Sequence, residues 1–258
     1  MSDMPLVPAT IDLDAELVTL ADRYRAADSL GLQLLNMINK PADSLLERLP
    51  RKARENLETL TIRGLEAGMS AASGTRVVVR DQADWVNTAT TTAAGLVGGF
   101  GGLPTALAEL PVTVTLLMRA VQGIAAEHGF DPDDLQTRKD TLLVFAASGP
   151  LVSDARIDMN FLASRTTLNG VNVYVSIGLI APKLAAVLGR KLATQTVPVL
   201  GAGVAAATNY TYTSYYQQMA HVVFGLRRLA ETTGTPFADL VERLETELRE
   251  RDVLSKSA

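Results

Sequence analysis

The segment 93–134 constrains the fold more than any other part of the chain. It begins with an apolar patch that holds five glycines and ends in an acidic stretch that contains a proline. Gly98 and Gly102 stand four positions apart, as do Gly95 and Gly99, so on a helix each pair lies on one face. Small residues at this spacing let two helices approach closely, although each interior glycine costs roughly 0.8–1 kcal/mol relative to alanine. A helix here therefore needs support from a protein core or from lipid.

An apolar helix is predicted directly after this patch, over residues 112–127. Pro111 suits its first position, because the missing backbone N–H has no helical partner there. Glu109 then lies at the N-terminal end, where the helix dipole favours a negative charge. Gly129 is predicted to end the helix, and Asp131 to cap the following one. One apolar stripe results, formed by Leu110, Val114, Leu117, Val121 and Ile124.

The remainder of the chain has the same helical periodicity. Residues 11–39 repeat apolar positions at spacings of three and four. Residues 171–180 are rich in β-branched residues, but no partner strand is evident, so we predict a buried helix there. We therefore predict an all-α fold with central glycine-rich helices, a single domain over 11–254, and flexible termini at 1–10 and 255–258. Breaks or starts of helices are predicted at Pro50, Pro182, Pro198 and Pro236.

Composition argues against several classes of protein. Hydrophobic residues make up 47% of the 258 residues but aromatic ones only 5%, which favours helices packed through alanine, leucine and valine. The net charge of −4 argues against general nucleic-acid binding. Because the chain has no cysteine and only two histidines, we expect no metal site. The first residues lack a basic start followed by an apolar run, so we expect no secretory signal and a cytoplasmic protein.

Two long runs without charged residues raise the question of a membrane. Polar residues and glycines dilute residues 85–108, and residues 192–226 contain only a short continuous apolar part, so peripheral contact is favoured over spanning helices. The basic residues between 51 and 80 form either a solvated helix face or a patch that meets anionic lipid. The single tryptophan suits a membrane interface or a protein core equally. The residues expected to contact membrane or lipid are Trp85, Gly95, Leu96, Gly98, Gly99, Phe100, Gly102 and Leu103.

Candidate catalytic residues are few, since the chain has no Gly-x-Ser-x-Gly and no His-Glu-x-x-His motif. Glu109 is a carboxylate in apolar surroundings, where desolvation raises a pKa; the alternative is a structural ion pair, for example with Arg119 or Arg156. His128 is expected to end its helix as a cation. His221 is either a structural residue or a general base. The candidate catalytic residues are Glu109, Asn209, Tyr212, His221 and Arg227, and all of these except His221 are expected to line a polar cleft.

Two stretches of the chain resemble one known family. The first, GGFGGLPTALAELPVTVTLLMRAVQGIAAEHGFDPDD, spans residues 98–134. The second combines the run 197–202, Asn209, residues 215–220 and the run FGLRRL at 224–229. Both are similar to the central and C-terminal signatures of the EcsC family, in the same order. Where the family carries a histidine before the phenylalanine of the second signature, this chain has Val223, and the nearest histidine is His221.

The apolar, small-residue segments favour a role at a membrane, and the resemblance implies an accessory one, because the family takes its name from a gene beside an ABC transporter. Its members have no agreed activity. We hypothesise a non-enzymatic protein without a cofactor that binds lipid, or docks on a membrane protein such as an ABC transporter, at the cytoplasmic face of the membrane. The alternative is a soluble, hydrolase-like enzyme with a polar cleft around Glu109. A third alternative is a soluble helical scaffold with every apolar face buried.

Overall fold

The computed structural model describes residues 12–38, 47, 49–75, 102–147, 149–151, 159–194 and 201–257. Throughout these ranges the regular structure is helical and no strand occurs, which confirms the all-α prediction. The helices are α1 (Leu13–Ile38), α3 (Arg51–Thr75), α5 (Gly102–Glu127), α6 (Leu135–Val144), α7 (Asn160–Asn169), α8 (Val173–Thr194), α9 (Gly201–Thr233) and α10 (Phe237–Ser257).

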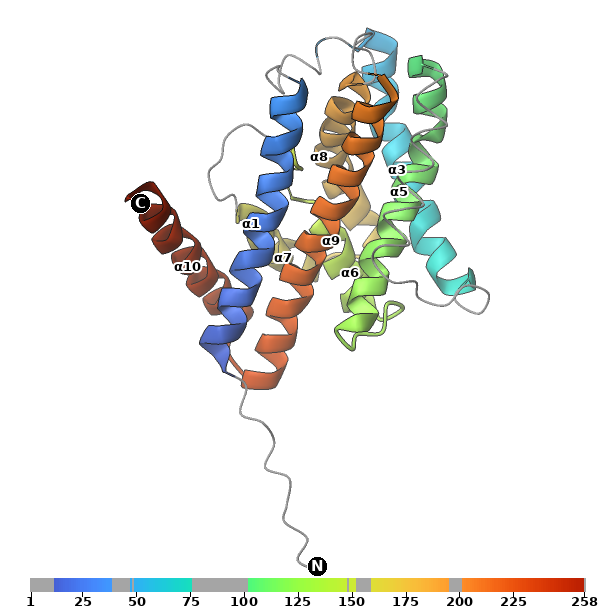
Figure 1. Ribbon diagram of the computed structural model, residues 1–258. Coiled ribbons are helices and arrows are strands. Elements are labelled where there is room, and N and C mark those ends of the chain that lie inside the picture. Colours follow the sequence, from blue (N-terminus) through green and yellow to red (C-terminus); the bar gives the residue numbers. More distant parts are fainter. Residues whose placement is uncertain are drawn as a thin grey trace, which may run out of the picture.

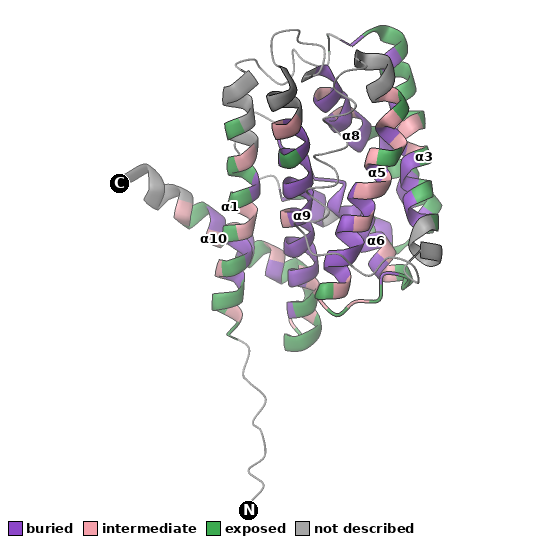
Figure 2. Cartoon of the chain, turned by 45° about the vertical axis from the view of Figure 1, so that its right-hand side comes forward, coloured by how far each residue is buried: buried purple, intermediate pink, exposed green. Residues whose placement is uncertain are grey.

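The long helix α9 organises the bundle. α1 packs along one side of α9 and α5 along another, while α3 lies against both α5 and α8 (Figure 1). The short helices α6 and α7 pack on each other, and α6 also contacts α5, α8 and α9. α10 packs on α1 and α9 and then projects away from the bundle. Buried residues follow much of α9 and the inner face of α5, whereas exposed residues follow the outer faces of α1 and α3 (Figure 2).

The helices α3 and α5 approach each other closely because two glycines of α3 face α5. A Cβ atom added at Gly64 would lie 2.7 Å from the Cβ of Val114, and one added at Gly68 would lie 2.7 Å from the Sδ of Met118. The hydroxyl of Thr115 donates a hydrogen bond to the carbonyl oxygen of Gly64 at 3.3 Å. Small residues four apart thus do bring two helices together, at a pair that the sequence analysis did not single out.

Two predicted helix starts are wrong because the helices pass through a proline. α5 runs without a break from Gly102 to Glu127, so Pro111 lies inside it. Glu109 consequently lies within the helix and not at its N-terminal end. α8 likewise continues through Pro182. An internal proline removes one helical hydrogen bond, and here the packing of the long apolar helices outweighs that local signal.

The start of α6 also differs from the prediction. Its cap is Asp134, whose side chain accepts hydrogen bonds from the backbone N–H groups of Gln136 and Thr137. Asp131, the predicted cap, instead accepts a hydrogen bond from the backbone N–H of Asp133 at 2.9 Å. The acidic run is therefore a turn that precedes the helix, and not the first turn of the helix itself.

Most residues expected to contact a membrane lie outside the described part of the chain: Trp85, Gly95, Leu96, Gly98, Gly99 and Phe100. Gly102 and Leu103 are the first residues of α5. Residues 1–10, expected to be flexible, also lie outside the described ranges. α10 continues to Ser257, into the stretch 255–258 where a flexible terminus was predicted.

Candidate functional site

Three of the predicted site residues lie toward the first half of α9. Asn209 and Tyr212 belong to α9 and are buried, and Glu109 is half-buried on α5. The hydroxyl of Tyr212 donates a hydrogen bond to the carbonyl oxygen of Val187 at 3.2 Å. Burial raises the pKa of Tyr212 well above its usual range. This phenol therefore stays protonated and engaged with the backbone of α8.

Lys191 of α8 joins this group, although the sequence analysis did not single it out. Its side chain is buried, with Nζ 5.8 Å from the centroid of the Tyr212 ring. Burial lowers the pKa of Lys191 to about 8, and the carboxylate of Glu109 partly offsets that effect. Lys191 of α8 thus lies beside Tyr212 of α9, within the electrostatic influence of Glu109 of α5.

Arg227 does not belong to this group. It follows Tyr212 by fifteen residues on the same helix, which places it roughly 22 Å farther along the helix axis. Its guanidinium is bound within a separate network of polar side chains, described below. The four residues expected to line an enzyme cleft, Glu109, Asn209, Tyr212 and Arg227, therefore do not converge on one point.

The turn between α5 and α6, residues 128–134, is attached to the second half of α9. The ring centroids of Phe130 and Phe224 lie 5.9 Å apart. The guanidinium carbon of Arg227 lies 4.0 Å from the centroid of the Phe130 ring, a cation–π contact. Positions three apart on a helix share a face, so Phe224 and Arg227 both present their side chains to the turn.

The two histidines of the chain meet at the start of this turn. Nε2 of His128 and Nδ1 of His221 are 3.1 Å apart, a hydrogen-bond distance. Burial, the neighbouring His221, and the cations Arg228 and Arg23 lower the pKa of His128 to about 4. His128 directly follows the last residue of α5, so its predicted place at the helix end is confirmed. Its lowered pKa disfavours the expected positive charge, because burial and neighbouring positive charges outweigh the helix dipole.

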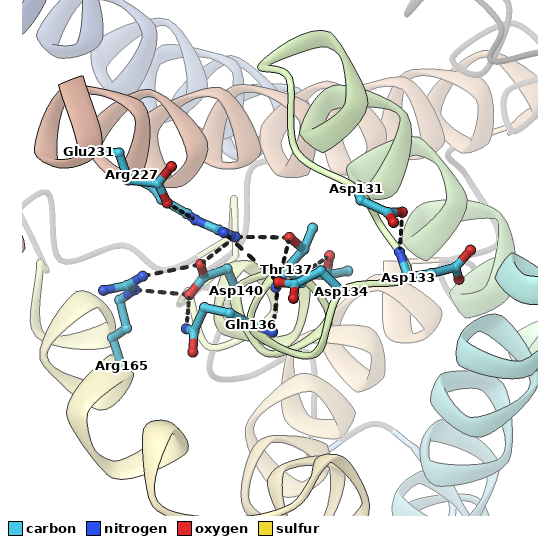
Figure 3. A network of polar contacts seen from close by, with 10 residues as sticks. Asp131, Asp133, Asp134, Gln136, Thr137, Asp140, Arg165, Arg227 and Glu231 are labelled. Atoms are coloured by element: carbon cyan, nitrogen blue, oxygen red, sulfur yellow. Dashed lines mark hydrogen bonds and ion pairs between the residues drawn. The ribbon is translucent and has the colours of Figure 1, made fainter.

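Asp140 is the centre of a buried network that joins α6, α7 and α9 (Figure 3). Its carboxylate accepts hydrogen bonds from Arg165 at 2.9 and 3.3 Å and from Arg227 at 3.3 Å. Gln136 donates a further one at 3.0 Å. Arg227 also donates to the hydroxyl of Thr137 at 2.9 Å. A carboxylate has about four lone-pair sites, so these bonds use its accepting capacity and indicate a structural role.

The sequence carried a signal for only some of these residues. The two histidines lie in or beside the two family-like stretches, which drew attention to them, but nothing in the sequence predicted that they pair. Asp140, Arg165 and Lys191 belong to no motif, and their roles follow only from the packing of the helices around them.

The first half of α8 exposes an apolar stripe. The stripe consists of Tyr174, Val175, Gly178, Leu179 and Pro182, all exposed. Tyr174 is 71% exposed and Leu179 is 52% exposed, and the exposed Lys183 follows the stripe. The helix predicted for residues 171–180 is confirmed from Val173 onward, but it is buried on one face only.

In the part of the chain that the structure describes, two helices are long and apolar enough to cross a membrane by length and composition alone. They are Leu107–Glu127 and Val173–Ala193, with mean hydropathies of 1.3 and 1.4. Inside the protein, 44% and 56% of their most apolar windows are buried, and two such helices are weak evidence for a membrane span. Among the described residues, no three histidine, aspartate or glutamate side chains gather where they could hold a metal ion.

The protein is a helical bundle in which the long helix α9 contributes Tyr212, His221 and Arg227 to three separate polar contacts with neighbouring helices and the turn 128–134. The model of the EcsC protein family matches residues 37–229, so the chain belongs to the EcsC family. The match includes α3 to α9, and it leaves out α10 and nearly all of α1. Comparisons with curated proteins and with solved structures find no match.

Proposed function

We propose that the protein is a non-enzymatic accessory protein that binds peripherally to the cytoplasmic face of a membrane through the apolar stripe of α8. The observation that supports this most is the exposure of Tyr174, Val175 and Leu179 on one helix whose opposite face belongs to the core. Large apolar side chains that face solvent together mark interaction surfaces in soluble proteins, whereas single exposed ones need no explanation.

The energy available from this stripe suits reversible binding. Transfer of one Leu or Val side chain from water to an apolar phase is worth about 1.5–3 kcal/mol. Two such side chains, Val175 and Leu179, together with the ring of Tyr174 favour a weak peripheral association, far from the insertion of a spanning helix. The partly buried state of α8 agrees with this, since its inner residues Ile177 and Ile180 remain in the core.

The chemistry of the stripe favours lipid over a protein partner. Gly178 and Pro182 have no side-chain hydrogen-bonding group, and Leu179 between them is apolar. Tyr174 is a residue type enriched where headgroups meet acyl chains. Lys183 adjoins the stripe and is exposed, so it is placed to meet anionic headgroups. Docking on a membrane protein is the other outcome that the test below separates.

The enzyme alternative receives less support from the same structure. Arg227 is engaged by Asp140 and Thr137, far along α9 from the other candidates. Tyr212 is protonated and bonded to a backbone carbonyl, and the neighbouring Lys191 is buried. Of the side chains expected to act together, Arg227 is therefore separated from the others and Tyr212 is already engaged.

Flotation with anionic liposomes at low salt tests the proposal. We expect the wild-type protein to rise with the vesicles. Leu179→Glu should lower the bound fraction by about tenfold or more, because it removes one apolar contact and adds a charge that anionic lipid repels. Val112→Glu is the matched control: Val112 is 59% exposed on a different helix, α5, and its substitution should leave flotation unchanged.

The outcomes separate the alternatives. Wild-type protein that stays at the bottom of the gradient at low salt overturns lipid binding. Flotation that occurs only with vesicles made from native membranes, and not with pure lipid, indicates docking on a membrane protein instead. Equal flotation of wild type and Leu179→Glu removes α8 from the contact surface.

A further inference from the structure

The pairing of the only two histidines in the chain has a chemical consequence. They lie 93 positions apart, and their facing nitrogens, Nε2 of His128 and Nδ1 of His221, are 3.1 Å apart. A hydrogen bond between two imidazoles needs an N–H on one facing nitrogen and a lone pair on the other. At least one of the two rings must therefore be neutral while the contact exists.

The contact lies where the turn 128–134 leaves α5. His128 directly follows the helix, and Gly129 adopts a left-handed conformation with φ of 86°. The backbone N–H of Phe130 donates back to the carbonyl oxygen of Ala125 at 2.9 Å. The chain therefore reverses sharply at His128, and its imidazole is the first side chain of the turn to reach α9.

Positive charge surrounds the pair. Arg23 reaches it from α1 and Arg228 from α9, and both lower the pKa of His128 in addition to burial and His221. Glu127, the carboxylate next to His128 on α5, is exposed to solvent. Two guanidinium groups oppose the binding of a metal cation between the rings, and they oppose a second proton for the same reason.

We infer that the His128–His221 hydrogen bond is an acid-sensitive clasp that ties the start of the turn 128–134 to α9 at neutral pH and opens when both imidazoles are protonated. With two protons on the facing nitrogens, two N–H groups point at each other and the hydrogen bond is lost. The contacts of Phe130 with Phe224 and Arg227 then remain and hold the rest of the turn on α9, so only its first residues loosen. This inference is independent of membrane binding.

The direction of the pH dependence follows from the lowered pKa of His128. Its value is about 4 in the folded protein and 6.5 for an unperturbed histidine. Because the folded state disfavours the proton, the stabilisation is fully present above about pH 6.5 and is lost as the pH falls toward about 4. The clasp is therefore closed at neutral pH and opens under acid conditions.

Proton NMR of the full chain tests the clasp directly, since only two imidazole spin systems exist. The His128 signals should stay constant from about pH 8 to about pH 6 and move only at lower pH. Over the same range the hydrogen-exchange protection of the Gly129 and Phe130 amides, corrected for intrinsic rates, should fall. The amide of Leu117, in the middle of α5, should keep its protection.

Three variants distinguish a clasp from simple burial. In His221→Gln the amide oxygen still accepts a hydrogen bond from a protonated His128, so the turn should stay protected in acid. Arg228→Gln removes an exposed cation beside the pair and should shift the His128 titration to higher pH. Arg243→Gln, an exposed arginine at the contact of α1 and α10, is the matched control and should not shift it.

Several results would overturn the inference. One is a His128 signal that titrates like an unperturbed histidine. Another is full protection of the Gly129 and Phe130 amides after His128 is protonated. A His128 midpoint that Arg228→Gln leaves unchanged also counts against it, and this readout remains decisive if His221→Gln fails to fold.

Discussion

Two contacts between arginine and aspartate lie in opposite surroundings. One is centred on Asp140 in the core, and the other joins Arg243 of α10 to Asp14 of α1 at the surface. The carboxylate of Asp140 is 1% exposed, and two guanidiniums and an amide fill its hydrogen-bonding sites. Asp14, which pairs with Arg243 across α1 and α10, is 83% exposed. The same chemical pair should therefore have very different effects on stability at the two places.

Burial decides the difference. Removing a charge from water is costly, and the mutual attraction of a buried pair repays that cost only when its hydrogen bonds are complete. Once the pair is built, loss of one partner leaves the other charge buried and unpaired. An exposed pair loses little when it is broken, because water and salt already screen it. The family match covers the buried network and leaves out α10 with its exposed pairs.

The largest effect is expected for Asp140→Ala. This change leaves Arg165 and Arg227 facing each other without their shared carboxylate, so the free energy of unfolding should fall by about 3–5 kcal/mol. Urea unfolding followed by circular dichroism measures it. Asp22→Ala, which breaks the more exposed pair with Arg251, is the control and should cost about 0–1 kcal/mol. Equal losses in the two variants would contradict the comparison.

The second prediction concerns the apolar contacts that hold α10 on the bundle, where the ion pairs are exposed. Leu240, Leu244 and Leu248 of α10 are buried at four-residue spacing. Leu244→Ala should lower the free energy of unfolding by about 2–5 kcal/mol, because it leaves a cavity under the helix. Leu135→Ala is the matched control, since Leu135 is 57% exposed on α6. Its effect should stay within about 0.5 kcal/mol.

Limited proteolysis adds a local readout for the same variant. If Leu244→Ala loosens only α10, cleavage should begin near Gly234, where the chain turns with φ of 69° between α9 and α10. A variant that resists both urea and protease as well as the wild type would show that the leucines are not what holds this helix.

The helices were predictable from the sequence, whereas the polar contacts between them were not. Apolar spacing located α1, and the absence of a partner strand correctly favoured a helix where 171–180 is rich in β-branched residues. Proline was misleading at Pro111 and Pro182, because packing of long apolar helices outweighs one lost hydrogen bond. A proline predicts a helix break from the residues beside it in the sequence, whereas the helix is stabilised by residues that pack against it in space.

The candidate site shows the same limit. Arg227 was singled out as a catalytic candidate, but its partner Asp140 comes from another helix that carries no motif pointing to it. Asp131 was expected to cap α6 because a proline follows it, and the cap is Asp134. The outer face of α8 was expected to be buried. An apolar helix has the same sequence pattern whether protein or solvent covers that face, so the pattern does not predict its exposure.

The smallest effects are expected at the contact of α1 and α10, and there the two partners should behave differently. An open groove of about 410 Å³ lies between the two helices. Its lining is mostly acidic and includes Asp14, Asp239, Glu242 and Glu247, with Arg243 as the arginine in the lining. Loss of Arg243 leaves carboxylates facing one another, whereas loss of Asp14 removes one carboxylate from the group.

We therefore expect Arg243→Gln to lower the free energy of unfolding by about 0.5–1 kcal/mol at low salt, and Asp14→Asn to change it by less than about 0.5 kcal/mol. Both effects should vanish at about 1 M salt, where charges are screened beyond about 3 Å. The double variant gives the coupling energy of the pair itself. A coupling above about 2 kcal/mol that persists at high salt would make this pair resemble the one at Asp140, and exposure would then not explain the difference between the two regions.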